Sequence, residues 1–322
     1  MRQLCVITGP TATGKTALGV RLARALGGEV ISADSMQVYR RMDIGTAKPT
    51  AAEMEGVPHH MLDRAEPWED YSAARYVREA SACADDIFRR GKLPLLVGGS
   101  MLYIDSLLRG REFSPMGDAA LRAALGAEYD RLGGAAALKK LAEADPDRAA
   151  RLHPGDKKRI VRALEIYRLT GKTATQRDAE ERARPPRYAA LTVELGFEDR
   201  QTLYNRIDSR VDEMLRRGLI EEVRSLLGEG VPRGGTAMQA IGYKEIAAAL
   251  LGELPMAEAV ETVKRESRRL AKRQLSWLRA RPGVLRIRWG ETPDLAAAEG
   301  QILRALADPT GRDKFSGGDT VE

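Results

Sequence analysis

Cysteine and histidine are scarce in this chain of 322 residues. It contains only Cys5 and Cys83, together with three histidines. Two cysteines exclude a disulfide framework and a four-cysteine zinc site, and a reducing compartment suits them. Cys83 shares a helical apolar face with Tyr76, Ala80 and Ile87, so we expect it to lie in the core.

Long apolar runs are absent as well. No window approaches the roughly 18 uncharged apolar residues that a membrane-spanning helix needs, and residues 4–7 are typical of a buried strand and not of a signal sequence. Hydrophobic residues make up 43% of the chain and charged residues 30%, which is enough apolar material for a large core. We therefore expect a cytoplasmic protein without membrane association. We also expect a monomer, although this expectation does not follow from composition.

Basic residues concentrate towards the C-terminus. Between Lys264 and Arg288 there are ten basic residues and a single acid, Glu266. That stretch carries +9, so the rest of the chain carries −3 of the overall charge of +6. A local basic patch on a mildly acidic body is typical of a protein that binds a polyanion, although a solvated basic helix would give the same run.

Strands and helices alternate along the first hundred residues. We predict strands at 4–7, 30–33 and 93–97, with one helix that carries Leu18, Leu22 and Leu26 on one face and another at 72–90. This alternation predicts an α/β fold, in which helices flank a parallel sheet.

The pattern changes after about residue 114. Residues 115–184 show helix signals and no strand, which indicates an inserted all-helical domain. Residues 185–307 then return to the first domain, so we expect 1–114 and 185–307 to form one core. Further elements are predicted there: a strand at 191–195, a helix at 201–217 and a strand at 284–289. Residues 308–322 are expected to be a disordered tail.

A phosphate-binding loop (P-loop) directly follows the first strand. The pattern G-x-x-x-x-G-K-[ST] is matched in full by Gly9, Pro10, Thr11, Ala12, Thr13, Gly14, Lys15 and Thr16. The glycines allow backbone N–H groups to face phosphate oxygens at a helix N-terminus. Lys15 supplies a charge for a diphosphate or triphosphate, and the Thr16 hydroxyl is placed to ligate magnesium.

The residues alone leave the ligand of this loop open. Asp34 follows the second strand and Ser100 follows the third, and the carboxyl ends of parallel strands share one edge of a sheet. Both side chains should therefore face the P-loop. A carboxylate there could hold magnesium, cap a helix or accept a proton.

Several longer motifs identify a family. The P-loop is followed by SADSMQVY at 32–39, MDIGTAKP at 42–49, PHH at 58–60, LLVGGSMLY at 95–103, GYK at 242–244 and KRQLSWLR at 272–279. In this order, from about residue 4 to 290, they resemble the bacterial tRNA dimethylallyltransferases.

This resemblance implies a P-loop core with a helical insertion and a reaction between two substrates. The donor would be dimethylallyl diphosphate, whose diphosphate the P-loop would hold with Mg²⁺. The acceptor would be the exocyclic amine of the adenosine directly 3′ of the anticodon in the tRNA anticodon stem-loop, turned out of its stack.

The resemblance also implies catalytic roles. Asp34 would take the proton of the amine, and Ser100 stands where the family usually has threonine. Lys15, Arg210 and Thr16 with its magnesium would neutralise the departing diphosphate. Arg159 is a second phosphate candidate, on one helical face with Arg162.

Residues expected to contact tRNA by the same resemblance lie in five segments. Gln37 and Gln239 would offer amides to base edges, whereas Lys272 and Arg273 suit backbone phosphates. Trp277 could stack on a base or belong to the core. The full set is Asp34, Ser35, Met36, Gln37, Ser100, Lys158, Arg159, Ile160, Val161, Arg162, Gln239, Ala240, Ile241, Gly242, Tyr243, Lys244, Lys272, Arg273, Gln274, Leu275, Ser276, Trp277, Leu278 and Arg279.

Other polar residues have simpler interpretations. His59 and His60 lack clustered cysteine or carboxylate ligands, so a structural or substrate-wall role is favoured over a metal site. Asp63 and Asp105 are most simply surface or capping residues, and Lys48 taken alone would be a surface lysine. The zinc finger that eukaryotic relatives often carry at the C-terminus is excluded by the two early cysteines.

Three competing functions remain open. A small-molecule or nucleoside kinase would explain residues 1–110 but gives no use for the basic stretch at 264–288. A prenyltransferase acting on free AMP would not need the anticodon-arm segments. A nucleotide-gated RNA-binding protein without catalysis would tolerate loss of Asp34.

Overall fold

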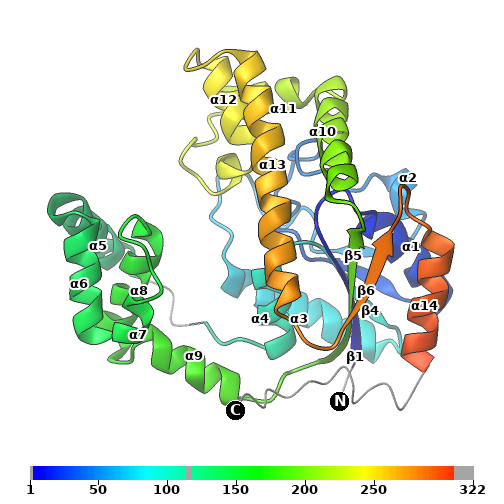
Figure 1. Cartoon of the computed structure of the whole chain (residues 1–322), viewed down its shortest axis with the longest axis horizontal. Helices are drawn as coiled ribbons and strands as arrows, with labels where there is room; N and C mark the ends of the chain where they lie inside the picture. Colours follow the sequence, from blue (N-terminus) through cyan, green and yellow to red (C-terminus); the bar gives the residue numbers. More distant parts are fainter. Residues whose placement is uncertain (1–2, 114–117, 308–322) are drawn as a thin grey trace. The chain divides into compact units, whose positions relative to one another are not determined.

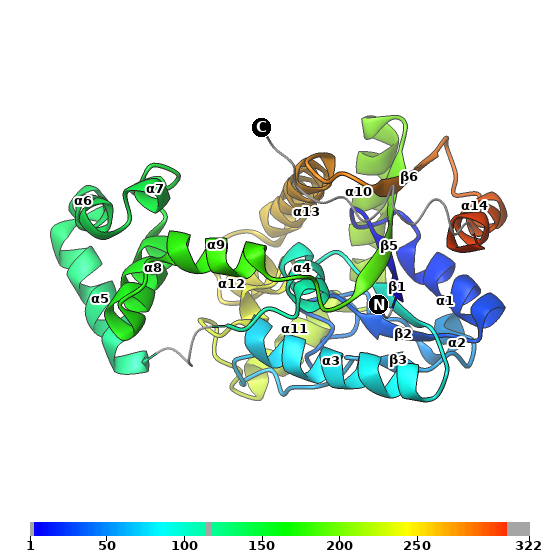
Figure 2. The same cartoon turned by 90° about the horizontal axis from the view of Figure 1, so that it is seen from below.

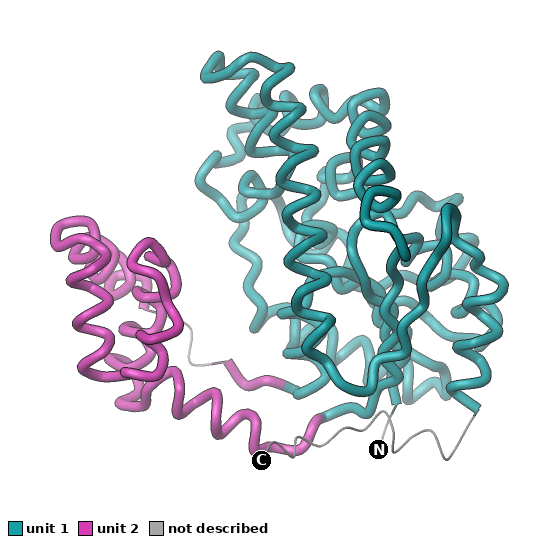
Figure 3. The backbone as a smooth tube through the Cα atoms, in the orientation of Figure 1, with its two compact units in different colours: residues 1–110, 187–322 teal, residues 111–186 magenta. Residues whose placement is uncertain are grey.

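The computed structural model describes residues 3–113 and 118–307, so the expected tail at 308–322 lies outside the described residues. The chain forms two compact units, residues 1–110 with 187–322 and residues 111–186 (Figure 3). No helix in the described part of the chain is both long and apolar enough to cross a membrane.

A six-stranded, wholly parallel sheet organises the first unit, as the alternating pattern predicts. Its order is β3-β2-β4-β1-β5-β6. The central strand is buried on both faces, because all four side chains from Leu4 to Ile7 are inaccessible. The strands are β1 Gln3–Thr8, β2 Glu29–Ser32, β3 His59–His60, β4 Pro94–Val97, β5 Ala189–Phe197 and β6 Val284–Trp289.

The edge strand β3 was not expected from the sequence. It pairs Val30 with His59 and Ile31 with His60. Two residues are too few to show the alternation by which a strand is recognised. His60 is held further by its Nε2 contact with Glu29 Oε2 at 2.8 Å.

Helices cover both faces of the sheet. In Figure 2, α3 (Ala73–Arg89) lies along one face, where it contacts β2, β4 and α4 (Met101–Arg109). On the other face α1 (Lys15–Leu26) contacts β1, β2 and β4 and packs on α14 (Leu295–Ala307). Leu18 of α1 and Ile302 of α14 share that core with Val193 of β5. Cys83, expected in the core, is only half-buried on α3.

A group of helices follows β5 in the same unit. The longest, α13 (Met256–Arg279), contacts α10 (Arg200–Arg216) and α12 (Tyr243–Leu250) (Figure 1). The same group includes α11 Leu219–Gly228 and the 3₁₀ turn Ala237–Gln239, whereas the short helix α2 Ala51–Met54 lies earlier in the chain, between β2 and β3.

The second unit consists of helices alone among its described residues. Its core includes Leu125, Leu141 and Ile160. Glu165 is fully buried there and pairs with Arg122 and Arg162, which compensates its desolvation. The helices are α5 Ala119–Leu132, α6 Gly134–Ala144, α7 Pro146–Ala149, α8 Lys157–Thr170 and α9 Ala174–Ala183.

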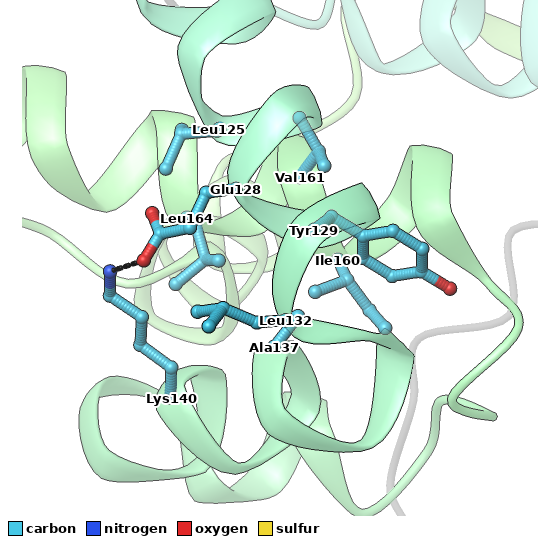
Figure 4. A pocket seen from close by; sticks show the side chains of 9 residues that line it. All are labelled: Leu125, Glu128, Tyr129, Leu132, Ala137, Lys140, Ile160, Val161 and Leu164. Carbon is cyan, nitrogen blue, oxygen red and sulfur yellow. Dashed lines mark hydrogen bonds and ion pairs between the residues drawn. The ribbon is translucent and has the colours of Figure 1, made fainter.

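A small cavity lies between the helices of this second unit. Leu125, Leu132 and Ile160 are among the residues that line it, and Glu128 pairs with Lys140 at 2.5 Å beside it (Figure 4). Its volume is about 10 Å³, which is the space of roughly one water molecule. The cavity is therefore a packing defect and not a ligand site.

Candidate active site

The P-loop curls between β1 and α1 through three residues with positive φ. Gly9 has φ 141°, Ala12 65° and Gly14 83°. A Cβ on Gly9 would lie 2.3 Å from the carbonyl oxygen of Leu195, so only glycine allows the loop to pass this close to β5. Lys15 begins α1 at the end of the loop, where the helix N-terminus favours an anion.

Side chains far along the sequence hold the loop in this shape. Trp289 donates from Nε1 to the Thr13 carbonyl at 3.0 Å, and Arg206 donates from Nε to the Ala12 carbonyl at 3.2 Å. Thr13 closes the loop from inside, donating from Oγ1 to Pro10 O at 2.8 Å. Sequence reasoning missed Trp289 and Arg206, because one reads only as a strand residue and the other as a helix residue.

Lys15, Arg210 and Asp34 are close enough to influence one another. The pKa of Lys15 is lowered to about 7, chiefly by burial and also by the charge of Arg210, while the charge of Asp34 opposes both. Burial also lowers the pKa of Arg210, against the charge of Asp34. Arg210 Nε is buried without a hydrogen-bond partner among the described residues. Two neighbouring basic side chains with lowered pKa values, one of them with an unused N–H donor, are suited to binding an anion.

Asp34 stands at the carboxyl end of β2 in a fixed orientation. Its Oδ1 accepts from the backbone N–H of Met36 at 2.8 Å and of Gln37 at 3.4 Å. Its Oδ2 accepts no hydrogen bond from the described residues. The carboxylate is therefore positioned by one oxygen and free at the other.

Ser100 lies beside Asp34, as the shared sheet edge predicts. Its Oγ accepts from Ser35 N–H at 2.9 Å, and its own N–H donates to Ala33 O at 2.9 Å. The two strand ends touch: a Cβ on Gly98 would lie 2.2 Å from Ala33 O. Asp34, Ser100 and the P-loop thus share one edge of the sheet.

The amide of Gln37 is already engaged within the protein. Its Nε2 donates to Thr46 O at 3.2 Å and to Ala47 O at 3.1 Å, and its Oε1 accepts from Ser32 Oγ at 3.0 Å. Gln239, by contrast, is exposed, and within the described ranges it donates only to Arg233 O at 2.8 Å. Of these two amides, only that of Gln239 has an oxygen without a partner among the described residues, which would be available for a base edge.

Helix α13 has two chemically different faces near its C-terminus. Lys272, Arg273 and Arg279 are exposed, and none has an ion-pair partner in the described part of the chain. Ser276 lies on this face too, although its hydroxyl donates to Lys272 O at 2.9 Å. On the opposite face lie Ala271, Gln274 and Leu278, all buried, with Leu275 packed against the core.

The remaining basic residues of the 264–288 stretch do not form one free patch. Lys264 pairs with Asp212 at 2.7 Å and Arg268 with Asp208 at 2.5 Å, which ties α13 to α10. Both arginines of β6 pair with the buried Glu194, Arg286 at 3.3 Å and Arg288 at 2.5 Å. The interpretation of the stretch as a single charge of +9 is corrected, because tertiary contacts neutralise much of it.

Trp277 is covered on one side. Arg281 lies over its ring, 4.0 Å from the centroid, and also pairs with Asp105 of α4. Burial lowers the pKa of Arg281 to about 10. Asp105 is therefore a partner that joins α4 to the end of α13, and not a plain surface residue.

Several residues expected at the RNA are buried. Ile160 and Val161 belong to the core of the second unit, next to the exposed Lys158 and Arg159. Ala240, Gly242 and Tyr243 are buried, whereas Ile241 is half-buried and Lys244 exposed. Contacts from these two segments would have to come from the exposed side chains or from backbone atoms.

Lys48 is buried, which corrects its interpretation as a surface lysine. Its Nζ donates to Tyr39 O at 2.8 Å, to Asp43 Oδ1 at 2.5 Å and to Asp63 Oδ1 at 2.6 Å. Lys48 thus holds together the loop that runs from Asp34 to Lys48. Asp63 is one of its structural partners. A buried ammonium needs such partners.

The donor set at the P-loop fits a magnesium ion held with a diphosphate. The Thr16 hydroxyl makes no hydrogen bond within the described residues. No cluster of three or more His, Cys, Asp or Glu side chains with metal-binding geometry occurs in the described ranges. A magnesium ion here would take Thr16 and phosphate oxygens, and magnesium is commonly bound through few protein ligands and several phosphate oxygens.

A parallel sheet whose first strand runs into this loop defines the class of P-loop proteins. The family described as IPP transferase matches residues 37–281. The tRNA dimethylallyltransferase 1 of Citrifermentans bemidjiense is 46% identical over 306 residues, which cover 95% of this chain and 97% of the relative. This chain therefore belongs to the IPP transferase family and is a prenyltransferase.

Solved structures agree with this assignment. The full-length tRNA isopentenylpyrophosphate transferase of Bacillus halodurans matches with a TM-score of 0.73 at 40% identity, over 98% of both chains. A eukaryotic dimethylallyltransferase acting on tRNA matches with a TM-score of 0.79 at 28% identity, over 100% of this chain and 82% of the other. The fold and the family predicted from the sequence motifs are confirmed.

Proposed function

We propose that this protein transfers a dimethylallyl group from dimethylallyl diphosphate to the exocyclic amine of the adenosine directly 3′ of the anticodon in tRNA. The position of Asp34 carries the proposal. One of its oxygens is held by two backbone N–H groups, the other accepts no hydrogen bond from the described residues, and the charge of Asp34 raises the pKa of both Lys15 and Arg210. An oriented base thus lies beside the groups that would hold the donor's diphosphate.

The chemistry exchanges one bond for another at the first carbon of the dimethylallyl group. The adenine N6 forms the new C–N bond, the C–O bond to the diphosphate breaks, and the diphosphate leaves with the electron pair. The N6 proton passes to Oδ2 of Asp34. Because the lone pair of this amine is delocalised into the ring, the amine is a weak nucleophile, and a positioned carboxylate assists it.

Ser100, Lys15 of the P-loop and Arg210 of α10 would complete the site. The hydroxyl hydrogen of Ser100 has no acceptor among the described residues, so it is available to orient the amine or Asp34. Negative charge grows on the departing diphosphate, and Lys15, Arg210 and the N–H groups of the P-loop would stabilise it. Magnesium, held by Thr16 and the phosphate oxygens, would supply further positive charge when bound.

The RNA is proposed to lie against exposed basic residues. On α13 these are Lys272, Arg273 and Arg279, which would contact phosphates and position the RNA without reading it. The helical insertion at 111–186 would contribute Lys158 and Arg159. The proposal assigns the anticodon stem-loop as the part of tRNA that is bound, by a monomer acting in the cytoplasm where tRNA is found.

A transfer assay tests the proposal directly. Radiolabelled dimethylallyl diphosphate is incubated with unmodified tRNA, with and without magnesium, and label in RNA is counted. We expect transfer that needs magnesium and vanishes when the adenosine beside the anticodon is changed to guanosine. Label that persists with the guanosine substrate would place the modification elsewhere, and no label at all would overturn the proposed reaction.

The kinase alternative is not favoured, because the relatives that span nearly the whole chain are named tRNA dimethylallyltransferases. A kinase would consume ATP with a small hydroxyl compound. The same preparation, assayed for ATP consumption without RNA, separates the two reactions.

A further inference from the structure

We propose that Glu222 of α11 is a positioning residue, which fixes the loop that carries Asp34 to the segment at 239–244. This inference rests on the proposed function, since it concerns the same catalytic carboxylate. Glu222 itself would touch neither substrate. It would act through the backbone of the loop between Asp34 and Lys48.

The carboxylate of Glu222 is fully used. Its Oε2 accepts from the backbone N–H of Asp43 at 2.9 Å and of Ile44 at 2.8 Å. Its Oε1 accepts from the N–H of Gly45 at 3.1 Å and from the hydroxyl of Tyr243 at 2.5 Å. All four partners are donors, so an ionised carboxylate satisfies them and a neutral amide, which presents N–H groups of its own, does not.

Tyr243 packs directly on the same turn. Its side chain is completely buried, and a Cβ on Gly45 would lie 2.4 Å from its ring. Burial, together with the neighbouring Glu222, raises the pKa of the Tyr243 hydroxyl well above its usual range, which keeps it a donor. The glycine in the motif at 42–49 is thus required by the close approach of an aromatic ring.

A second set of hydrogen bonds joins this turn to Asp34. The amide of Gln37 holds the carbonyls of Thr46 and Ala47, directly after the turn that Glu222 holds. The backbone N–H of Gln37 in turn donates to Asp34 Oδ1. The contacts therefore run without a gap from Glu222, through residues 43–47 and Gln37, to the catalytic carboxylate.

The other end of this connection reaches the proposed RNA contacts. Tyr243 is the first residue of α12, which packs against α11 (Figure 1). It lies between Gly242, whose N–H donates to Glu245 Oε2 at 2.9 Å, and the exposed Lys244. A segment that would touch RNA through Lys244 is thereby fixed, one residue away, to the loop of Asp34. The function of Tyr243 is explained by this bridge and not by contact with a base.

The test uses Glu222→Gln in the full-length protein, in the transfer assay with saturating donor and tRNA. We expect kcat to fall about tenfold or more, because small displacements of a catalytic group are costly, while the Kd for tRNA changes less than about threefold. Tyr243→Phe, which removes one of the four donors, should give a smaller fall. Glu221→Gln is the matched control on the same helix, since Glu221 is exposed and pairs only loosely with Arg224 at 3.5 Å.

Two further measurements separate positioning from loss of folding. In a double-mutant cycle, Glu222→Gln should have much less effect on kcat when Asp34 is already changed to Asn, because both substitutions act on one group. If the double variant lost kcat by the product of the two single-variant factors, the proposal would be overturned. An unchanged kcat in Glu222→Gln would overturn it as well. A fall in kcat that matches the unfolded fraction measured by thermal denaturation would overturn it equally.

Failure of the proposed function can be distinguished from failure of the positioning role of Glu222. If the unaltered protein transfers no label, hydrogen exchange still reports on the loop. Faster exchange of the amides of residues 43–45 in Glu222→Gln than in Glu221→Gln would uphold Glu222 as the residue that orders this loop. Equal exchange in the two variants would overturn that role.

Discussion

Gln274 of α13 donates a hydrogen bond from Nε2 to the backbone carbonyl of Gly99 at 2.9 Å. The contact is so close that a Cβ on Gly99 would lie 2.5 Å from Nε2. Gly99 immediately precedes Ser100, and Gln274 is two residues beyond the exposed Lys272. One side chain therefore joins the proposed RNA-facing helix to the strand end that lies beside Asp34.

This relationship predicts the behaviour of Gln274→Met. The substitution keeps the length of the side chain and removes the donor to Gly99. It also removes Oε1, which is buried without a partner in the described structure, so the two effects on stability oppose one another. We expect a small change in melting temperature but a fall in kcat of about tenfold, as the turn at Ser100 loosens. Thermal unfolding and steady-state kinetics on one preparation measure both, and an unaltered kcat would contradict the prediction.

Asp34→Asn should separate catalysis from binding. Asparagine keeps an oxygen to accept from the N–H groups of Met36 and Gln37, so the turn is preserved, but it cannot take the N6 proton. We expect kcat to fall by about 10² to 10⁴, the usual contribution of a general base, with the Kd for tRNA nearly unchanged. Filter binding and single-turnover transfer measure the two quantities. Lost binding with surviving chemistry would make Asp34 a recognition residue.

The lowered pKa of Lys15 predicts proton uptake when the donor binds. In the free protein the pKa of this lysine is lowered to about 7, so the side chain is mostly charged well below pH 7 and mostly neutral well above it. A bound diphosphate favours the charged form and raises that pKa. At pH 8.5 the binding of dimethylallyl diphosphate should therefore be accompanied by the uptake of about one proton. The affinity for this donor should fall as the pH rises above 7.

Calorimetry with dimethylallyl diphosphate and no RNA measures this uptake. Titrations in two buffers with different ionisation enthalpies give the number of protons bound. Lys15→Arg is the control, because arginine stays charged throughout this range and should take up none at this position. An affinity that is constant from pH 7 to 9 in the unaltered protein would argue against the shifted pKa.

Lys272 and Lys264 form a matched pair on α13 for the RNA interface. Lys272 is exposed and free of ion pairs in the described structure, whereas Lys264 is held by Asp212. Lys272→Ala should weaken tRNA binding and reduce the slope of log K against log salt by about one, because one phosphate contact is lost. Lys264→Ala should leave the slope unchanged. Equal slopes in both variants would show that charge on this helix acts without direct contact.

Local patterns explain why so much of the fold could be predicted. Strand and helix periodicities are properties of neighbouring residues, and a parallel sheet with helices on both faces follows from their alternation. The P-loop is a contiguous motif, and Asp34 and Ser100 are placed by the rule that parallel strands end at one edge. The predicted strand at 284–289 is β6 to the residue.

Pairings across the chain were beyond sequence reasoning. Glu194 lies in a strand that reads as apolar, and nothing near it indicates that Arg286 and Arg288 will neutralise it. Lys48 looks like a surface lysine until Asp63 is brought beside it, and Trp289 shows no link to the P-loop in the sequence. Each contact joins residues that only the packed sheet brings together.

The sequence by itself determined the family, the P-loop and the identity of the candidate base, because these depend on contiguous residues whose chemistry is local. The tertiary structure alone decided which charges remain free and which side chains are held. It paired Lys264 and Arg268 each with an aspartate and Arg286 and Arg288 with the one carboxylate of Glu194, left Lys272 exposed, and buried Tyr243 against Gly45. The physical reason is that desolvation and ion pairing depend on what lies across a contact, and residues separated by tens or hundreds of positions meet only when the core has formed.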